Sequence, residues 1–163
     1  ISSGLKYLEK GQNPYTPAVS LYYGLSEALQ MMQEEGLDNI IERHRGYRDM
    51  VRTSVRAMGL KLLARDENAS HALTAVVAPE EIGANKIRKY MLDQFNIVLA
   101  GGQQSLDNVI FRIGHLGYVR ELDLLAALAA LEITLQKLGW DVQLGAGVSK
   151  AQEFLLNKAK KGE

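Results

Sequence analysis

Apolar residues recur at helical spacing along most of this chain. The clearest stripe predicts a helix over 120–138. Its leucines follow one another at i, i+4, i+7, i+11 and i+14, at Leu124, Leu128, Leu131, Leu135 and Leu138. Similar stripes predict three further helices, over 17–35, 38–58 and 79–95. A last helix is expected from about Ser149, with Gln152 as its capping-box partner.

Between these helices the period changes to that of β-strands. Four short runs rich in Leu, Val, Ile and Thr are separated by polar segments, and they cover 60–64, 72–78, 96–100 and 109–115. The order is therefore two long helices, then strand, strand, helix, strand, strand, helix, helix. Short strands with helices available to cover one face predict an α+β fold.

Residues 1–36 stand apart from this layer, because the helix over 17–35 has no sheet of its own to pack on. We therefore expect residues 1–36 to be a piece of one domain and residues 37–163 to form a second domain. The helix over 38–58 is long enough, at roughly 30 Å, to run from one domain into the next.

Composition narrows the functional classes. Lys plus Arg and Asp plus Glu number 19 each, so a nucleic-acid partner is not expected. The absence of cysteine excludes disulfides, thiolate metal sites and a cysteine nucleophile. No apolar run reaches the roughly 18 residues of a membrane span. A soluble, cytoplasmic protein is the expectation.

Two sets of charged or titratable residues have structural interpretations. A stripe of arginines could face phosphates, but a solvated helix face fits the zero net charge better; it contains Arg45, Arg48, Arg52 and Arg56. The histidines lack metal-ligand spacing, so no metal site is expected, and the one that ends a strand is interpreted as structural. They are His44, His71 and His115.

Three positions carry candidate chemistry. Thr16 precedes Pro17 where an N-cap precedes the first helical residue, so it either caps a helix or helps that helix end to hold an anion. Gly101 and Gly102 follow a strand, where they allow either close approach of a ligand or a sharp turn.

Arg112 interrupts the apolar strand Val-Ile-Phe-Arg-Ile, and alternation places it on the face opposite Phe111 and Ile113. A guanidinium there either binds a carboxylate through its planar fork or reaches water on an open sheet face.

Several stretches together resemble a known family. The segments GQNPYTPAVSLYYGLSEALQMMQEEGLDNIIERH and IVLAGGQQSLDNVIFRIGHLG are similar to the C-terminal part of class V, fold-type-I, pyridoxal-phosphate-dependent aminotransferases. The likeness is to the alanine–glyoxylate and serine–glyoxylate branch, which includes proteins labelled as a subunit of a soluble hydrogenase. It implies a short, mostly antiparallel sheet covered by helices in the small domain over 37–163, preceded by the end of the large domain.

The resemblance also implies roles for individual residues. Thr16, with Tyr15 beside it, would contact the phosphate of pyridoxal 5'-phosphate across a homodimer interface. Arg112 would bind the α-carboxylate of amino-acid and 2-keto-acid substrates, with Gly101 and Gly102 shaping the substrate loop. The implied activity is transfer of an amino group from alanine or serine to glyoxylate or a similar 2-keto acid.

One departure limits this expectation. Members of the family hold the cofactor on a Schiff-base lysine well before the Tyr-Thr-Pro element, and only fifteen residues precede Thr16 here. The chain is therefore expected to be a C-terminal fragment with no catalytic residue of its own, inactive by itself. The alternative is a non-catalytic dimerisation or binding module, such as an accessory subunit of a soluble hydrogenase.

Overall fold

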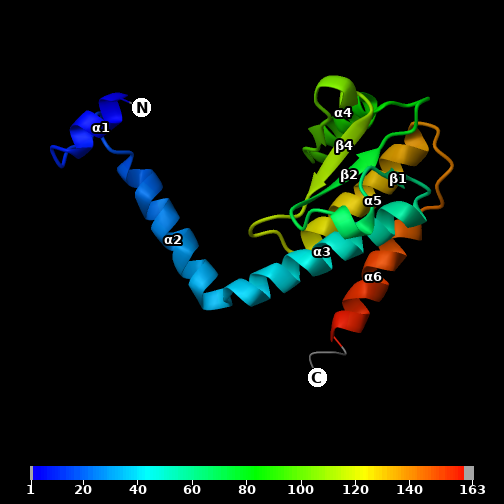
Figure 1. The fold of residues 1–163 in the computed structure, drawn as a ribbon. Coiled ribbons are helices and arrows are strands. Elements are labelled where there is room, and N and C mark those ends of the chain that lie inside the picture. Colours follow the sequence, from blue (N-terminus) through cyan, green and yellow to red (C-terminus); the bar gives the residue numbers. More distant parts are fainter. Residues whose placement is uncertain (1, 160–163) are drawn as a thin grey trace. The chain divides into compact units, whose positions relative to one another are not determined.

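The computed structural model describes residues 2–159. Packing divides the chain into two compact units, residues 1–40 and residues 41–163 (Figure 1). The division falls in the first turn of a long helix, α3 (Leu37–Ala57). Each unit is described by itself below.

The first unit consists of two helices, α1 (Ser2–Leu8) and α2 (Val19–Glu35). No residue of α2 is buried, so its apolar stripe is exposed. The predicted helix start was wrong by two residues: Ala18 is the N-cap, no side chain caps α2, and Thr16 lies in the irregular segment before it. Thr16 is therefore not a helix cap.

The second unit contains most of α3, four strands and three further helices. The strands are β1 (Lys61–Leu62), β2 (Leu73–Val77), β3 (Ala100–Gly101) and β4 (Ile110–Gly114). The helices are α4 (Ala84–Phe95), α5 (Glu121–Lys137) and α6 (Ala146–Ala159). Two short 3₁₀ turns, Asp66–Asn68 and Gln104–Leu106, lie in the polar segments. The predicted α+β order is confirmed.

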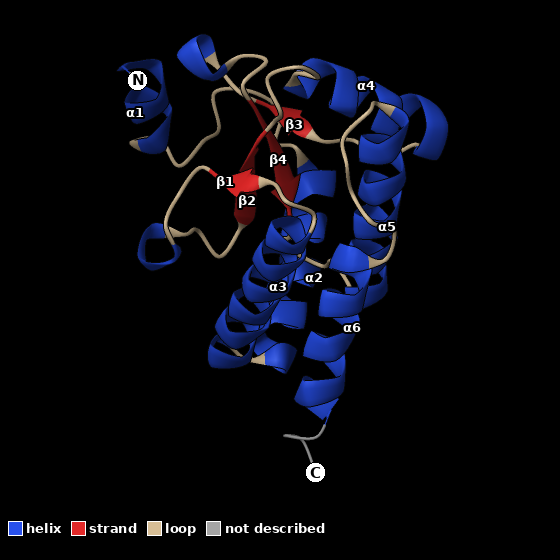
Figure 2. Cartoon of the chain, turned by 90° about the vertical axis from the view of Figure 1, so that its right-hand side faces the viewer, coloured by secondary structure: helices blue, strands red, loops and turns tan. Residues whose placement is uncertain are grey.

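The four strands form one antiparallel sheet in the order β1-β2-β4-β3. Helices α3 to α6 gather on one side of it (Figure 2). Alternation along β2 buries Thr74 and Val76 and leaves the residues between them half-exposed. The other face of the sheet is thus not covered by helices of this unit, and we call it the open face.

The predicted third strand was displaced. The run 96–100 begins with the left-handed C-cap of α4, Asn96, whose N–H donates to the Leu92 carbonyl. Only Ala100 and Gly101 then pair with β4. The end of α4 at Phe95 is as predicted, whereas its start at Ala84 lies five residues later than the predicted 79; the first residues of the expected strand form the C-cap and an irregular segment instead.

The core lies between the helix-covered face of the sheet and helices α3, α4 and α5. Phe111 of β4, Ile87 and Met91 of α4, and Leu128 of α5 are almost fully buried. The leucine stripe of the strongest predicted helix is therefore confirmed as a core face, with its first four leucines buried.

The arginine stripe on α3 is only partly a solvated face. Arg52 is 3% exposed, and its guanidinium lies 2.6 Å from Oδ1 of Asp66 and donates to the Ala64 carbonyl at 2.8 Å. Arg56 reaches the same carboxylate. These contacts pin the polar turn after β1 onto α3, which the i, i+3, i+7 spacing could not reveal.

A buried carboxylate fixes the start of the last helix. Glu132 of α5 is 2% exposed and accepts backbone N–H groups from Gly145 (2.7 Å), Gly147 (2.5 Å) and Val148 (3.1 Å). These donors belong to the first turn of α6, which has no intrahelical acceptors for them. The expected start near Ser149 was therefore wrong, because the cap comes from another helix.

Replacing Glu132 by Gln tests this cap. The amide keeps one acceptor oxygen but turns an NH₂ group toward N–H donors, and we expect a loss of about 2 kcal/mol in the free energy of unfolding. Urea denaturation followed by circular dichroism measures it. Glu153→Gln is the control, because Glu153 forms an exposed pair with Lys150 on the surface of α6 and its replacement should change stability by less than about 0.5 kcal/mol. Equal stability of the two variants would contradict the capping role.

Candidate functional site

The open face of the sheet presents one guanidinium at its centre. Arg112 of β4 lies opposite Ala75 of β2 and Ala100 of β3, so the residues on either side of it are small. Its neighbours Phe111 and Ile113 are buried on the other face, which confirms the predicted alternation. Arg112 is half-buried, and its side chain is accessible from the open face.

Arg112 has one hydrogen bond and no ion pair within the described residues. Its Nε donates to the carbonyl of Gly101 at 3.0 Å. No carboxylate oxygen of the described residues lies within 4.0 Å of its guanidinium. The two terminal amino groups are therefore free to bind an anion of two oxygens side by side.

The two glycines before the loop each have a steric reason within the chain. A Cβ on Gly101 would lie 2.7 Å from Nη1 and 2.9 Å from Cζ of Arg88. A Cβ on Gly102 would overlap the carbonyl of Leu106, which is backbone and cannot give way. The Gly102 N–H also donates to the Ile110 carbonyl at 3.0 Å. Both glycines thus shape the turn that precedes Arg112.

Arg88, which the sequence did not single out, joins this turn to α4. Its Nε donates to the Leu99 carbonyl at 2.9 Å, and its Nη1 donates to Oδ1 of Asn85 at 2.9 Å. It follows the buried Ile87 and reads in the sequence as one more polar position of an amphipathic helix. The one sequence signal was the Gly-Gly pair after α4, which indicated close packing against Gly101 and Gly102.

Thr16 and Tyr15 lie in the first unit, just before α2. Both are exposed, Tyr15 at 82%. The first turn of α2 has no acidic residue and no side-chain cap. The N–H groups of Val19 and Leu21 donate to the Pro17 and Ala18 carbonyls, and the positive end of α2 meets no competing negative group from that turn.

The rings of His44 and His115 have structural partners. Nε2 of His44 accepts the Gly117 N–H at 3.0 Å. The His115 ring is buried, with Nδ1 at 3.0 Å from the His71 carbonyl and Nε2 at 2.9 Å from the Thr74 hydroxyl. Because a carbonyl only accepts, Nδ1 carries the proton and Nε2 accepts from Thr74. Across residues 2–159 no three metal-ligating side chains cluster.

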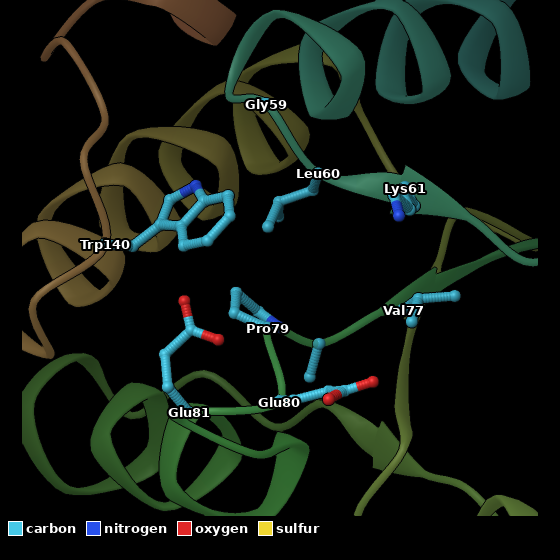
Figure 3. Close-up of a pocket in the computed structure, with 9 residues that line it drawn as sticks. Gly59, Leu60, Lys61, Val77, Pro79, Glu80, Glu81 and Trp140 are labelled. Atoms are coloured by element: carbon cyan, nitrogen blue, oxygen red, sulfur yellow. The ribbon is translucent and has the colours of Figure 1, made fainter.

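A pocket of about 320 Å³ lies beside β1, and Arg112 is not among the residues that line it (Figure 3). Leu60, Pro79 and the indole of Trp140 line it, and the Glu81 carboxylate points toward that indole. The indole Nε1 is already occupied, because it donates to the Met58 carbonyl at 3.0 Å. None of the sequence-predicted site residues lines this pocket.

None of the helices within residues 2–159 combines the length and apolarity needed to cross a bilayer.

Comparisons with known proteins place this geometry in a family. The small subunit of a soluble hydrogenase from Synechococcus sp. is 47% identical over 147 residues, 90% of this chain and 38% of that protein. Serine–glyoxylate aminotransferase of Arabidopsis thaliana is 40% identical over 153 residues, 93% of this chain and 38% of that protein. No protein-family model matches the chain.

A solved structure agrees with these relatives. Ureidoglycine–glyoxylate aminotransferase from Bacillus subtilis matches with a TM-score of 0.88 at 31% identity, over 94% of this chain and 41% of that one. The fold is thus that of the C-terminal portion of an aminotransferase. The chain belongs to the class V pyridoxal-phosphate-dependent aminotransferases, in the group that includes the glyoxylate aminotransferases. It spans about two fifths of the length of the curated relatives that it matches.

The burial of His115 predicts a dependence of stability on pH. Burial lowers the pKa of its imidazole from 6.5 to about 4, helped by the nearby charges of His44 and Arg48. Between pH 6.5 and 4 the unfolded chain therefore binds a proton at this residue that the folded chain does not bind. The free energy of unfolding falls as the pH falls through this range. The full loss amounts to about 3 kcal/mol at 1.36 kcal/mol for each pKa unit.

Urea denaturation between pH 4.5 and 7 measures this slope. His115→Gln removes the titrating group and should make the slope shallower by about one proton, although the variant is less stable at pH 7. A slope unchanged by the substitution would show that other groups carry the pH dependence.

Proposed function

We propose that the protein to which this chain belongs is an aminotransferase that uses pyridoxal 5'-phosphate. It moves an amino group from alanine or serine to glyoxylate or a similar 2-keto acid. The observation that carries the proposal is Arg112, a guanidinium on the open face with both terminal amino groups free. The glyoxylate aminotransferases among the relatives support it. Because the chain spans about two fifths of those relatives, the activity belongs to the full-length protein.

Arg112 supplies the binding group that such substrates need. Alanine, serine and glyoxylate share one carboxylate, and a planar guanidinium binds a carboxylate with two parallel hydrogen bonds. Since Nε is held by the Gly101 carbonyl, Nη1 and Nη2 are left to meet the two oxygens end-on. The small side chains of Ala75 and Ala100 leave room for the ligand beside the fork.

The residues before α2 fit the phosphate of the cofactor. Thr16 offers a hydroxyl donor, and α2 offers its positive end without a competing acidic residue in its first turn. Tyr15 offers a second hydroxyl from an exposed side chain. Thr16 and Tyr15 would therefore hold the phosphate in the full-length protein.

When bound, the cofactor provides the electron sink that lets the Cα–H bond of an amino acid break. The contribution of this chain is to orient the substrate. Arg112 fixes the carboxylate, and that leaves the Cα–H bond with a defined direction for proton removal. In the family that this chain resembles, the Schiff-base lysine lies before the Tyr-Thr-Pro element, so we assign no catalytic residue to this chain.

The same proposal includes a homodimer in the cytoplasm, with each active site shared between two subunits. The exposed apolar side chains of α2 support an interface; they include Leu21, Leu25, Leu29 and Met32. Contiguous apolar surface of this kind is typical of a contact with another protein surface.

The name of the Synechococcus relative favours a second candidate, an accessory subunit of a soluble hydrogenase. Such a role would be non-catalytic here, because nickel–iron hydrogenases need cysteine thiolates and this chain has none. A pyridoxal-phosphate absorbance band in the purified full-length protein, with turnover of serine and glyoxylate, distinguishes the aminotransferase from the accessory subunit.

The first test of the proposal is Arg112→Ala in the full-length protein. Charge-assisted hydrogen bonds are worth about 1.5–3 kcal/mol, so KM for both the amino acid and the 2-keto acid should rise 10- to 100-fold. Arg65→Ala is the control, because its side chain is 85% exposed and it should leave both KM values unchanged. Unaltered kinetics in Arg112→Ala would overturn the proposal.

The second test is Thr16→Val, which removes the hydroxyl and keeps the shape. We expect the dissociation constant of pyridoxal 5'-phosphate, measured by titrating the apoenzyme and following absorbance, to rise about tenfold. Thr53→Val on the exposed side of α3 is the matched control and should bind the cofactor normally. Equal affinity of the two variants would remove Thr16 from the phosphate site.

A further inference from the structure

Two guanidinium groups hold the outer edge of the sheet beside the proposed substrate site. Arg112 lies on the open face, because its partners Ala100 and Ala75 point there. Arg88 lies on the helix-covered face: Gly101 is paired with the buried Phe111, and a Cβ on Gly101 would meet the Arg88 guanidinium at 2.7 Å. The two arginines thus approach β3 from opposite faces.

Both arginines donate Nε to main-chain carbonyls of this edge. The next residue, Gly102, donates its N–H to Ile110 of β4, so the polar groups of Gly101 point away from β4, toward the outer edge. Arg112 donates to the Gly101 carbonyl at 3.0 Å. Arg88 donates to the Leu99 carbonyl at 2.9 Å. No further strand pairs with this edge within residues 2–159.

Arg88 also connects the edge to the loop that leads into β4. Its Nη1 donates to the Asn85 side chain at 2.9 Å, and the Asn85 N–H donates to Oδ1 of Asn108 at 2.9 Å. The N–H of Ala84 donates to the Asn108 carbonyl at 2.9 Å. One end of α4 therefore holds both ends of the segment that runs from Leu99 to Asn108.

Arg88 has no ion pair to explain its presence. Among the described residues no carboxylate oxygen lies within 4.0 Å of its half-buried guanidinium, although arginine is well suited to such ion pairs. Its hydrogen bonds go to a carbonyl and an amide that shape the turn. The contacts of Arg88 therefore serve the geometry of this segment.

We propose that Arg88 is a positioning residue for Arg112. It holds the Leu99–Gly101 edge against α4, and the Gly101 carbonyl in turn holds Nε of Arg112. If that carbonyl moves, the fork of Arg112 swings away from the direction in which it meets a carboxylate. The inference rests on the proposed function, because it assumes that Arg112 binds the substrate carboxylate.

The main test compares Arg88→Ala, Arg88→Lys and the control Lys86→Ala in the full-length enzyme. Lys86 is exposed on the same helix, so its replacement removes an equal charge without touching the turn. We expect both Arg88 variants to raise KM for the amino acid and for the 2-keto acid about tenfold, with kcat within about twofold. Lysine should not rescue, because a single ammonium lacks the fork that reaches Leu99 and Asn85 together.

A second variant disrupts the same contact without changing Arg88. In Gly101→Ala the new Cβ displaces the Arg88 guanidinium, so this variant should show the same KM increase as Arg88→Ala. The double variant should be no worse than either single one, because both remove one contact. Likewise, Arg88→Ala should have no further effect on KM in an Arg112→Ala background.

Hydrogen–deuterium exchange of the full-length protein gives a readout that is independent of turnover. Amides of the 99–108 segment should exchange faster in Arg88→Ala and Gly101→Ala than in Lys86→Ala, while those of α5 keep their protection. If Arg88→Ala does not fold, Gly101→Ala and Arg88→Lys carry the comparison.

The possible failures are distinguishable. If Arg112→Ala raises KM while the Arg88 variants behave like Lys86→Ala, this inference is overturned and the proposed function stands. If Arg88→Ala and Arg112→Ala raise KM additively, Arg88 acts by another route and the inference is likewise overturned. If Arg112→Ala leaves KM unchanged, the proposed function itself fails.

Discussion

The register of β4 between its two neighbours is the constraint on which the rest of this unit depends. β4 pairs with β2 on one side and with β3 on the other, so Phe111 faces the helices and Arg112 faces the open side. A slip of one residue would exchange these two faces. It would put a guanidinium without a partner into the core, at a cost far above that of one lost strand pair. The stability of the core and the direction of the candidate binding group are therefore set by the same pairing.

The turn before β4, next to the Arg112 guanidinium, is tightly packed. Gly102 has no space for a side chain because of the Leu106 carbonyl, and a side chain at Gly101 would have to displace the Arg88 guanidinium. Asn108 adopts a left-handed backbone, with φ of 56°, as it returns the chain to the sheet. The turn that carries the Gly101 carbonyl, and with it the hydrogen bond to Nε of Arg112, is thus defined by contacts within the chain.

Much of this arrangement could be predicted from the amino-acid pattern. The leucine stripe of α5, the alternation around Arg112 and the order of helices and strands all follow from local periodicity, which each residue's immediate neighbours determine. The resemblance also identified the family correctly. The assignment of Thr16, Tyr15, Gly101, Gly102 and Arg112 to substrate or cofactor remains a prediction.

The features that could not be predicted depend on partners far along the chain. Glu132 caps α6 from another helix, and the buried Arg52 pairs with Asp66 of a distant turn. Neither spacing nor composition predicts these two contacts. Arg88 was missed for the same reason. Of the two alternatives for Thr16, capping of α2 is wrong, because a Thr-Pro pair at a helix start is a local signal and the helix begins after Ala18.

The contacts of Trp140 and Gly147 affect how this unit folds during its synthesis. The indole of Trp140 bonds to Met58, 82 residues earlier, and Gly147 packs against Ser54 and Met58. Since a nascent chain leaves the ribosome N-terminus first, the apolar face of α3 is not fully covered until nearly the whole unit has been translated. The last segments to be made thus complete the packing around the first, and until then the apolar face of α3 is where a nascent chain is open to aggregation.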